Sequence, residues 1–148
     1  MNKVFFDLEW NTGFLDGNSF DEIIEIGAVK TDEEYRQIDG FRRLIRPVIY
    51  RKMNPYIQKI LAITMKDLQG EEPLAAVAKV FFDWCGDCDT LIAWSGNDFG
   101  VLEKNLAHIG MKIPEQLGRY DVQMAYAYRT ENSIRNYALK TAVEAMEL

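Results

Sequence analysis

The sequence predicts an α/β fold in which a mixed sheet carries helices on its faces. Strand-like apolar stretches come first, at residues 3–9, 22–30 and 41–47, and the short connections between them indicate a three-strand antiparallel meander. Apolar residues at helical spacing then alternate with short strands along the rest of the chain. Strands followed by alternating helices and strands are typical of a mixed sheet that gains parallel strands and is flanked by helices.

The turns and helix boundaries of the first half have clear local signals. A polar turn around "DGNS" (residues 16–19) separates the first two strands, and Pro47 ends the third. Helices are predicted over residues 54–64 and 73–85, where Pro73 suits a first helical turn. The chain up to residue 85 is therefore expected to form the meander and two helices.

The second half is predicted to alternate between helices and short strands. Gly110 is the expected end of one helix, whereas Asp121 and Ser133 are the expected N-caps of two others. The predicted elements are a buried strand at 90–94, a helix at 99–110, an edge strand near 119–120, and helices at 121–129 and 133–146.

Length and composition predict one domain spanning residues 1–148. The chain has 148 residues, 48% of them hydrophobic, which is enough for a sizeable core. Its net charge of −6 argues against a protein that coats nucleic acid through bulk charge, but not against an enzyme whose site carries its own cations. With two cysteines, no signal peptide and no apolar run of about 18 residues, we expect a cytoplasmic protein without a membrane partner.

Two carboxylates end the first strand, in the stretch "VFFDLEW". Side chains alternate along a strand, so Asp7 and Glu9 share one face, where they repel each other and a positive group is expected. An edge-strand surface is one interpretation. The alternative is a site, because the strand is apolar on both faces, as central strands are, and α/β sites form at the C-terminal ends of such strands. Hard oxygen ligands of this kind suit Mg²⁺ or Mn²⁺.

A third carboxylate, Asp98, follows the later buried strand in "LIAWSGNDFG". Asn97 or Asp98 could serve simply as a helix N-cap. If residues 3–9 and 90–94 form neighbouring strands, however, Asp98 opens onto the same edge of the sheet as Asp7 and Glu9. Divalent cations explain three converging carboxylates better than packing does.

These stretches together resemble a known family. "FFDLEW", "DEIIEIGAV", "NPYIQKILAIT" and "AWSGNDFGVLEKNL", in that order, are similar to the DEDD (DnaQ-like) 3′–5′ exonucleases, which have the RNase H-like fold. The resemblance runs through nearly all of the chain. Asp7 and Glu9 match the family's first motif, and Asp98 matches the acid of its second.

The resemblance implies hydrolysis of phosphodiester bonds at the 3′ ends of single-stranded DNA or RNA with two Mg²⁺ or Mn²⁺ ions. Asp7 would bridge both ions, Glu9 would hold the ion that activates water, and Asp98 would hold the other. The sequence does not choose between DNA and RNA.

The resemblance also implies substrate-binding residues around the first motif. Leu8, Trp10, Asn11 and Phe14 would lie near the terminal nucleotide. Trp10 or Phe14 would stack on a base, with core packing as the alternative.

The family's third motif, a His or Tyr followed by a fourth acid on a late helix, has no match. His108 is expected to be a surface or packing residue, Tyr137 is followed by Thr141 where an acid is needed, and Glu144 and Glu147 are expected to be exposed. The sequence therefore predicts three of four metal-binding acids, no general base and a missing last helix. Either the chain is a C-terminally truncated exonuclease, or it is a degenerate metal- or nucleic-acid-binding module. The uncovered apolar strip would favour a homodimer.

Two other patterns are expected to carry no chemistry. The thiols of "WCGDC" follow a helix, whereas a thioredoxin-like C-x-x-C precedes one, so Cys85 and Cys88 are predicted to be incidental. In "FRRLIR", Arg42 and Arg46 share one strand face and are expected to be solvated surface, with a track for backbone phosphates as the alternative.

Overall fold

A computed structural model describes residues 1–131 and 138–147. Its five strands form one mixed sheet in the order β3-β2-β1-β4-β5. β1, β2 and β3 pair antiparallel, whereas β4 pairs parallel with both β1 and β5, which confirms the predicted meander and parallel strands. The strands are β1 (Lys3–Leu15), β2 (Asn18–Thr31), β3 (Gln37–Leu44), β4 (Thr90–Ala93) and β5 (Gly118–Asp121).

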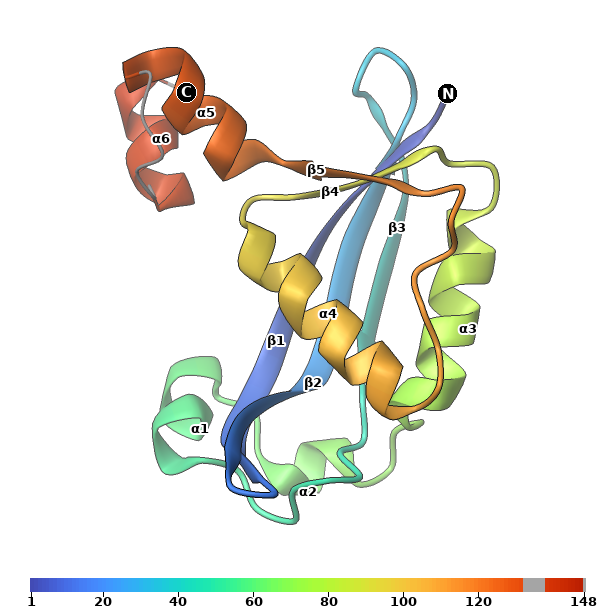
Figure 1. The fold of residues 1–148 in the computed structure, drawn as a ribbon, viewed down its shortest axis with the longest axis vertical. Helices are drawn as coiled ribbons and strands as arrows, with labels where there is room; N and C mark the ends of the chain where they lie inside the picture. Colours follow the sequence, from blue (N-terminus) through green and yellow to red (C-terminus); the bar gives the residue numbers. More distant parts are fainter. Residues whose placement is uncertain (132–137, 148) are drawn as a thin grey trace.

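Helices cover both faces of this sheet (Figure 1). α4 crosses one face, with α3 beside it, while α1 and α2 lie at the hairpin end of β1 and β2 and α5 and α6 follow β5. No helix within the described ranges is long and apolar enough to cross a membrane. The helices are α1 (Pro55–Leu61), α2 (Met65–Leu68), α3 (Leu74–Cys85), α4 (Gly96–His108), α5 (Val122–Glu131) and α6 (Leu139–Ala145).

The main core lies between the sheet and the helices α3 and α4. On β1 it takes the alternate residues Val4, Phe6 and Leu8, and on the helices it includes Phe81 and Leu102. Because successive strand residues point to opposite faces, this packing turns the intervening residues of β1 toward the other face. That second face carries the acids.

A β-bulge separates the two apolar clusters of the fold. The register between β1 and β2 shifts after Glu9, which leaves Ile24 as the extra residue on β2. The shift allows Ile23 and Ile26, three positions apart, both to face the main core, whereas Ile24 packs under α1 and α2. The bulge therefore lets α1 and α2 cover the part of the second face that lies toward the β1–β2 hairpin.

Several element boundaries differ from the expected ones. β1 and β2 extend further into their hairpin, and β3 ends at Leu44 rather than at Pro47. The predicted helix at 54–64 is two helices, because Ala62 adopts a left-handed conformation that ends α1 and Thr64 then caps α2. Of the predicted helix 133–146, α6 is described, and its expected cap Ser133 lies outside the described residues.

The loop between β3 and α1 is fastened to β2 by one buried carboxylate. Glu22 is 4% exposed and accepts backbone N–H bonds from Val48, Ile49 and Tyr50 at 2.8, 2.8 and 2.9 Å. Hydrogen bonds to a charged acceptor are about twice as strong as neutral ones. This carboxylate fixes the loop that leads to α1.

A buried amide fastens the same loop to β1. Asn11 is 1% exposed; its Oδ1 accepts from the Asn54 backbone N–H at 2.8 Å, and its Nδ2 donates to the Lys52 carbonyl at 3.1 Å. The Asn54 side chain in turn accepts from the Tyr56 N–H as the N-cap of α1. The position of α1 is thus tied to both central strands.

Replacing Glu22 by Gln is expected to lower the free energy of unfolding by roughly 2–4 kcal/mol. The amide removes the charge and turns an N–H₂ donor toward backbone N–H groups that already donate. Urea unfolding measures this change. Glu72→Gln, at an exposed glutamate, is the matched control and should stay within about 0.5 kcal/mol of wild type. Equal effects of the two substitutions would contradict the role given to Glu22.

Candidate functional site

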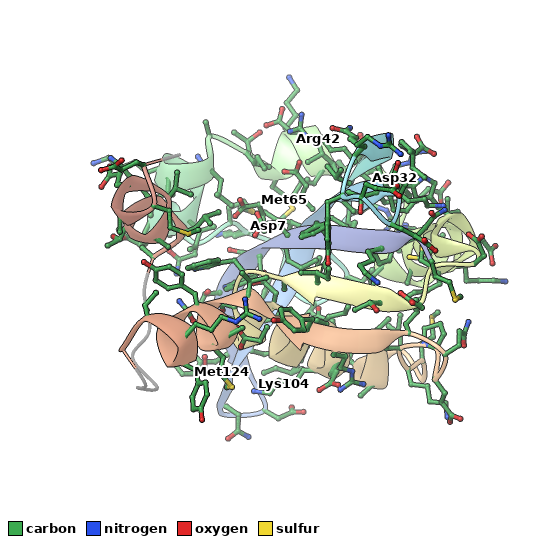
Figure 2. The ribbon with its side chains drawn as sticks, turned by 90° about the horizontal axis from the view of Figure 1, so that it is seen from above. Asp7, Asp32, Arg42, Met65, Lys104 and Met124 are labelled. Atoms are coloured by element: carbon green, nitrogen blue, oxygen red, sulfur yellow. The ribbon has the colours of Figure 1, made fainter. Side chains whose placement is uncertain are left out.

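Asp7 and Glu9 lie on the face of β1 that is turned away from the main core. β1 is the third of five strands, so the interpretation of these acids as an edge-strand feature is wrong. Asp7 is exposed and Glu9 is half-buried. Figure 2 shows Asp7 near the middle of the sheet, between Arg42 on the β3 side and Met124 on the α5 side.

Asp98 reaches these acids because β4 is the parallel neighbour of β1. The register pairs Phe5 with Ile92, and the chain turns into α4 just beyond the end of β4. Ser95 caps α4 by accepting from the Asn97 N–H at 3.0 Å, so neither Asn97 nor Asp98 is the N-cap. Asp98 lies instead in the first turn and is 7% exposed.

The pKa of Asp98 is raised to about 6, mainly because burial disfavours its charged form. The neighbouring charge of Asp7 raises it further, and that of Asp121 adds a smaller increase. The backbone N–H groups of Leu8 and of Asp98 itself oppose the rise. The two acids of the first and second motifs therefore stand close enough to repel each other.

The pKa values of Asp7 and Glu9 are raised as well. For Asp7, desolvation against the sheet is the largest cause, and the charge of Glu25 also contributes. For Glu9, desolvation comes first, followed by the charges of Asp7, Glu25 and Asp98. The three predicted acids thus belong to one patch of negative charge.

Glu25 is a fourth carboxylate of this patch, and the sequence analysis did not select it. It pairs directly across from Glu9, an arrangement of like charges that is unfavourable in a sheet. The side chain of Arg42 on β3 donates to it through Nε. The register of the β1–β2 hairpin would have predicted Glu25, since it sets Glu25 opposite Glu9.

Asp121 at the end of β5 borders the patch on its other side. Its Oδ1 accepts from the Met124 N–H at 2.9 Å, which confirms its predicted role as the cap of α5. Its Oδ2 lies against Gly96, where an added Cβ would stand 2.8 Å from that oxygen. The lack of a side chain at Gly96 therefore allows α4 to begin beside Asp121.

The donors suit a hard divalent cation, although their side chains do not form a finished cage. Within residues 1–131 and 138–147, no three His, Cys, Asp or Glu side chains gather closely enough to hold a metal ion. Carboxylate oxygens are nevertheless the ligands that Mg²⁺ and Mn²⁺ prefer, and the repulsion among Asp7, Glu9 and Asp98 is what a cation would relieve. A complete site requires these side chains to turn toward one another.

An apolar cavity of about 640 Å³ opens beside Asp7. Phe5, Val29 and Ile92 of the sheet line it, and Leu139 of α6 lies along its wall.

Two of the residues predicted to lie near the terminal nucleotide have buried side chains, so those side chains do not form the surface of the site. Leu8 is 4% exposed and belongs to the main core; only its backbone N–H faces the acids. Asn11 is 1% exposed and uses its amide to hold the loop before α1. The alternation of β1 turns Leu8 inward, and the bulge after Glu9 changes which residues follow on each face.

The two predicted stacking aromatics also lie elsewhere. Trp10 is half-buried and packs against the main core, as the alternative interpretation held. Phe14 is 77% exposed but lies seven residues beyond Asp7 on β1, about 23 Å along the strand at about 3.3 Å per residue. Phe14 is therefore not a wall of the site.

Of the residues expected to take no part, His108 is remote from the acids. His108 is exposed at the last turn of α4, with its ring 5.7 Å from that of Phe20, and stands about 15 Å along the helix from Asp98. Glu144 and Glu147 are exposed. Tyr137 lies outside the described residues.

The C-x-x-C thiols lie in the interior of the protein. Cys85 and Cys88 are both free and buried. Burial raises the pKa of Cys85 to about 12, so its thiol is protonated at neutral pH.

Asp98→Asn is expected to stabilise the cation-free protein at high pH. The folded state binds the Asp98 proton more tightly than the unfolded state, whose pKa is about 3.8, so wild-type stability falls as pH rises from 3.8 through about 6. Asn keeps an acceptor oxygen without the buried charge. In the presence of a chelator at pH 8, the free energy of unfolding of the variant should exceed that of wild type by up to about 3 kcal/mol.

Urea unfolding across a pH series measures this difference, which should shrink toward zero as the pH approaches 3.8. Asp16→Asn, in the exposed hairpin turn, is the matched control. A difference that stays constant with pH would contradict the raised pKa of Asp98.

Known proteins share sequence and fold with this chain. The family model RNase_T, described as exonuclease, matches residues 4–147. The DNA polymerase III PolC-type of Clostridium perfringens is 34% identical over 112 residues, which cover 74% of this chain and 7% of the polymerase.

Solved structures share the fold at low sequence identity. The nuclease domain of 3′hExo, a DEDDh family member bound to rAMP, matches with a TM-score of 0.74 at 17% identity over 89% of this chain and 71% of its own. Cell-death related nuclease 4 (CRN-4) matches with a TM-score of 0.79 at 13% identity, over 99% of this chain and 55% of its own. E. coli exonuclease I with a dT13 oligonucleotide gives 0.68 at 16% identity, over 93% and 32%.

The chain therefore spans about half of CRN-4, about a third of exonuclease I and a small part of the polymerase. Its sheet order and flanking helices are those of the RNase H-like fold of DEDDh exonucleases. Together with the family match over nearly its full length, this places the chain in the exonuclease family, among the DnaQ-like DEDD exonucleases.

Proposed function

We propose that the protein is a divalent-cation-dependent 3′–5′ exonuclease that hydrolyses phosphodiester bonds at the ends of single-stranded nucleic acid. The observation that carries this proposal is that Asp7 and Glu9 on β1 lie beside Asp98, which stands in the first turn of the helix that follows the adjacent parallel strand β4. Three similar structures support the substrate class, since their complexes contain rAMP, a dT13 oligonucleotide and a histone mRNA stem-loop.

Asp7, Glu9 and Asp98 would hold Mg²⁺ or Mn²⁺, two ions in the proposed arrangement. When bound, such ions stabilise the charge on the attacking and leaving oxygens of an in-line displacement. The protein itself positions the carboxylates and favours their ionised form. The β1–β4 pairing sets the separation of Asp7 from Asp98, and the Leu8 N–H favours the charged form of both.

A second candidate is a module that binds cations or nucleic acid without cutting. One observation favours it: within the described part of the chain, the sole histidine lies at the opposite end of α4 from Asp98 and cannot act as a general base there. Cleavage assays separate the two candidates.

Asp7→Asn is expected to abolish cleavage. The purified chain is incubated with 5′-labelled single-stranded DNA or RNA in Mg²⁺ or Mn²⁺, and products are resolved by length. Wild type should give a ladder that shortens from the 3′ end, and the variant should be slower by about 100-fold or more, the scale seen when a stabiliser of developing charge is removed. Asp16→Asn should cleave like wild type. No cleavage of either substrate by wild type would overturn the exonuclease proposal.

Cation binding provides a readout that does not depend on turnover. Isothermal titration calorimetry should detect Mn²⁺ binding to wild type, with at least about tenfold weaker binding by Asp7→Asn, because one charged ligand is lost. Bound cation should also raise the melting temperature, since it binds the folded state alone. Wild type that binds no Mn²⁺ would contradict the ligand assignment.

A further inference from the structure

One row of residues crosses three strands on the face that carries the acids. Asp7 of β1 pairs with Gly27 of β2, and Gly27 pairs with Arg42 of β3. Directly paired strand residues point to the same face, so Asp7 and Arg42 rise from one side of the sheet. Two interstrand spacings of about 4.8 Å set their backbones about 10 Å apart.

The middle position of this row carries no side chain. A Cβ added at Gly27 would meet no atom within 4 Å, so the space above it is open. Gly27 lines the same apolar cavity as Asp7. Nothing at this position obstructs a ligand that extends from Asp7 toward Arg42.

The neighbouring rows are covered on one side and apolar on the other. In the row of Glu9 and Glu25, Leu44 packs against the cluster under α1 and α2. In the row on the other side, Phe5 and Val29 form the floor of the cavity. The row of Asp7, Gly27 and Arg42 is therefore a lane between the acidic row of Glu9 and Glu25, which Leu44 closes, and the apolar floor of the cavity.

Glu25 holds Arg42 in this lane. The Nε of Arg42 donates to Glu25, whose side chain is 12% exposed, while the Arg42 side chain is 75% exposed. Within the described part of the chain this is the one hydrogen bond that the Arg42 guanidinium makes, so its Nη groups have no protein partner there. The charge of Glu25 is thus paired beside Glu9, and this ion pair holds the Arg42 side chain in place.

We propose that Arg42 binds a backbone phosphate of the nucleic-acid strand held at Asp7 and Glu9, and that Gly27 keeps the path between them open. This inference rests on the proposed function and assigns to that site a phosphate contact. A guanidinium matches phosphate geometry with paired N–H donors. The sequence favours solvated surface over a phosphate track for Arg42; the register of β1, β2 and β3 is what places it in line with Asp7.

Binding, rather than cleavage, tests this contact. The probe is a 5′-fluorescein single-stranded oligonucleotide with nuclease-resistant phosphorothioate linkages at its 3′ end, followed by fluorescence anisotropy in Mg²⁺ over a range of salt concentrations. Arg42→Gln should raise Kd about tenfold, as expected for a lost bond between charged groups. It should also reduce the slope of log K against log salt by about 0.7, the value for one phosphate contact on a single strand.

Three further variants define the result. Arg36→Gln is the matched control, because Arg36 is 73% exposed, pairs with Asp32 and Glu34, and lies in the connection between β2 and β3. It should bind like wild type. Arg42→Lys should restore the salt slope, since the charge returns. Gly27→Val, which closes the lane where space allows a side chain, should weaken binding with an unchanged fold by circular dichroism.

The outcomes distinguish a failure of the Arg42 contact from a failure of the proposed exonuclease function. Unchanged affinity and slope in Arg42→Gln, with wild type binding, would overturn the Arg42 contact alone. Equal losses in Arg42→Gln and Arg36→Gln would overturn it as well, since the effect would be one of net charge. Wild type that binds no oligonucleotide would overturn both the contact and the proposed function.

Discussion

The parallel pairing of β4 with β1 is the contact on which the site depends. It sets Ile92 beside Phe5, so that β4 ends alongside the middle of β1 and the turn after β4 delivers Asp98 to Asp7. Ser95 then starts α4 at a point that places Asp98 in the first turn, near backbone N–H groups. Without this pairing, the acids of the two motifs would lie apart in space.

The same pairing concentrates negative charge in a way that works against folding. Asp7, Glu9 and Asp98 each have a raised pKa, and Glu25 stands across from Glu9. The protein offsets part of this repulsion with the Arg42–Glu25 pair and with the Leu8 N–H. What is left unbalanced lies at the centre of the sheet, and uncompensated charge at one point is typical of a site built for a ligand rather than for stability.

Local sequence patterns predicted most of the sheet and most of the helices because apolar periodicity follows burial. They also singled out the three acids, although Asp7 and Glu9 lie within β1 and not at its end, because β1 continues into the hairpin to Leu15. They could not predict Asn11 or Leu8 correctly, because the bulge after Glu9 and the loop before α1 decide what those side chains touch. Glu25 was missed, and Arg42 was not connected to the acids, for a related reason: a register between strands assigns neighbours that no single segment contains.

The separation of β1 and β4 along the chain also determines when the site can exist. The meander of β1, β2 and β3 is built from short-range hairpin contacts, whereas the contact of Phe5 with Ile92 closes a long loop, the kind of contact that forms late because loop closure costs entropy. A chain with the meander alone would carry Asp7 and Glu9 but not Asp98. Cation affinity would then report on complete assembly of the sheet, and an unfinished chain would be a weak binder.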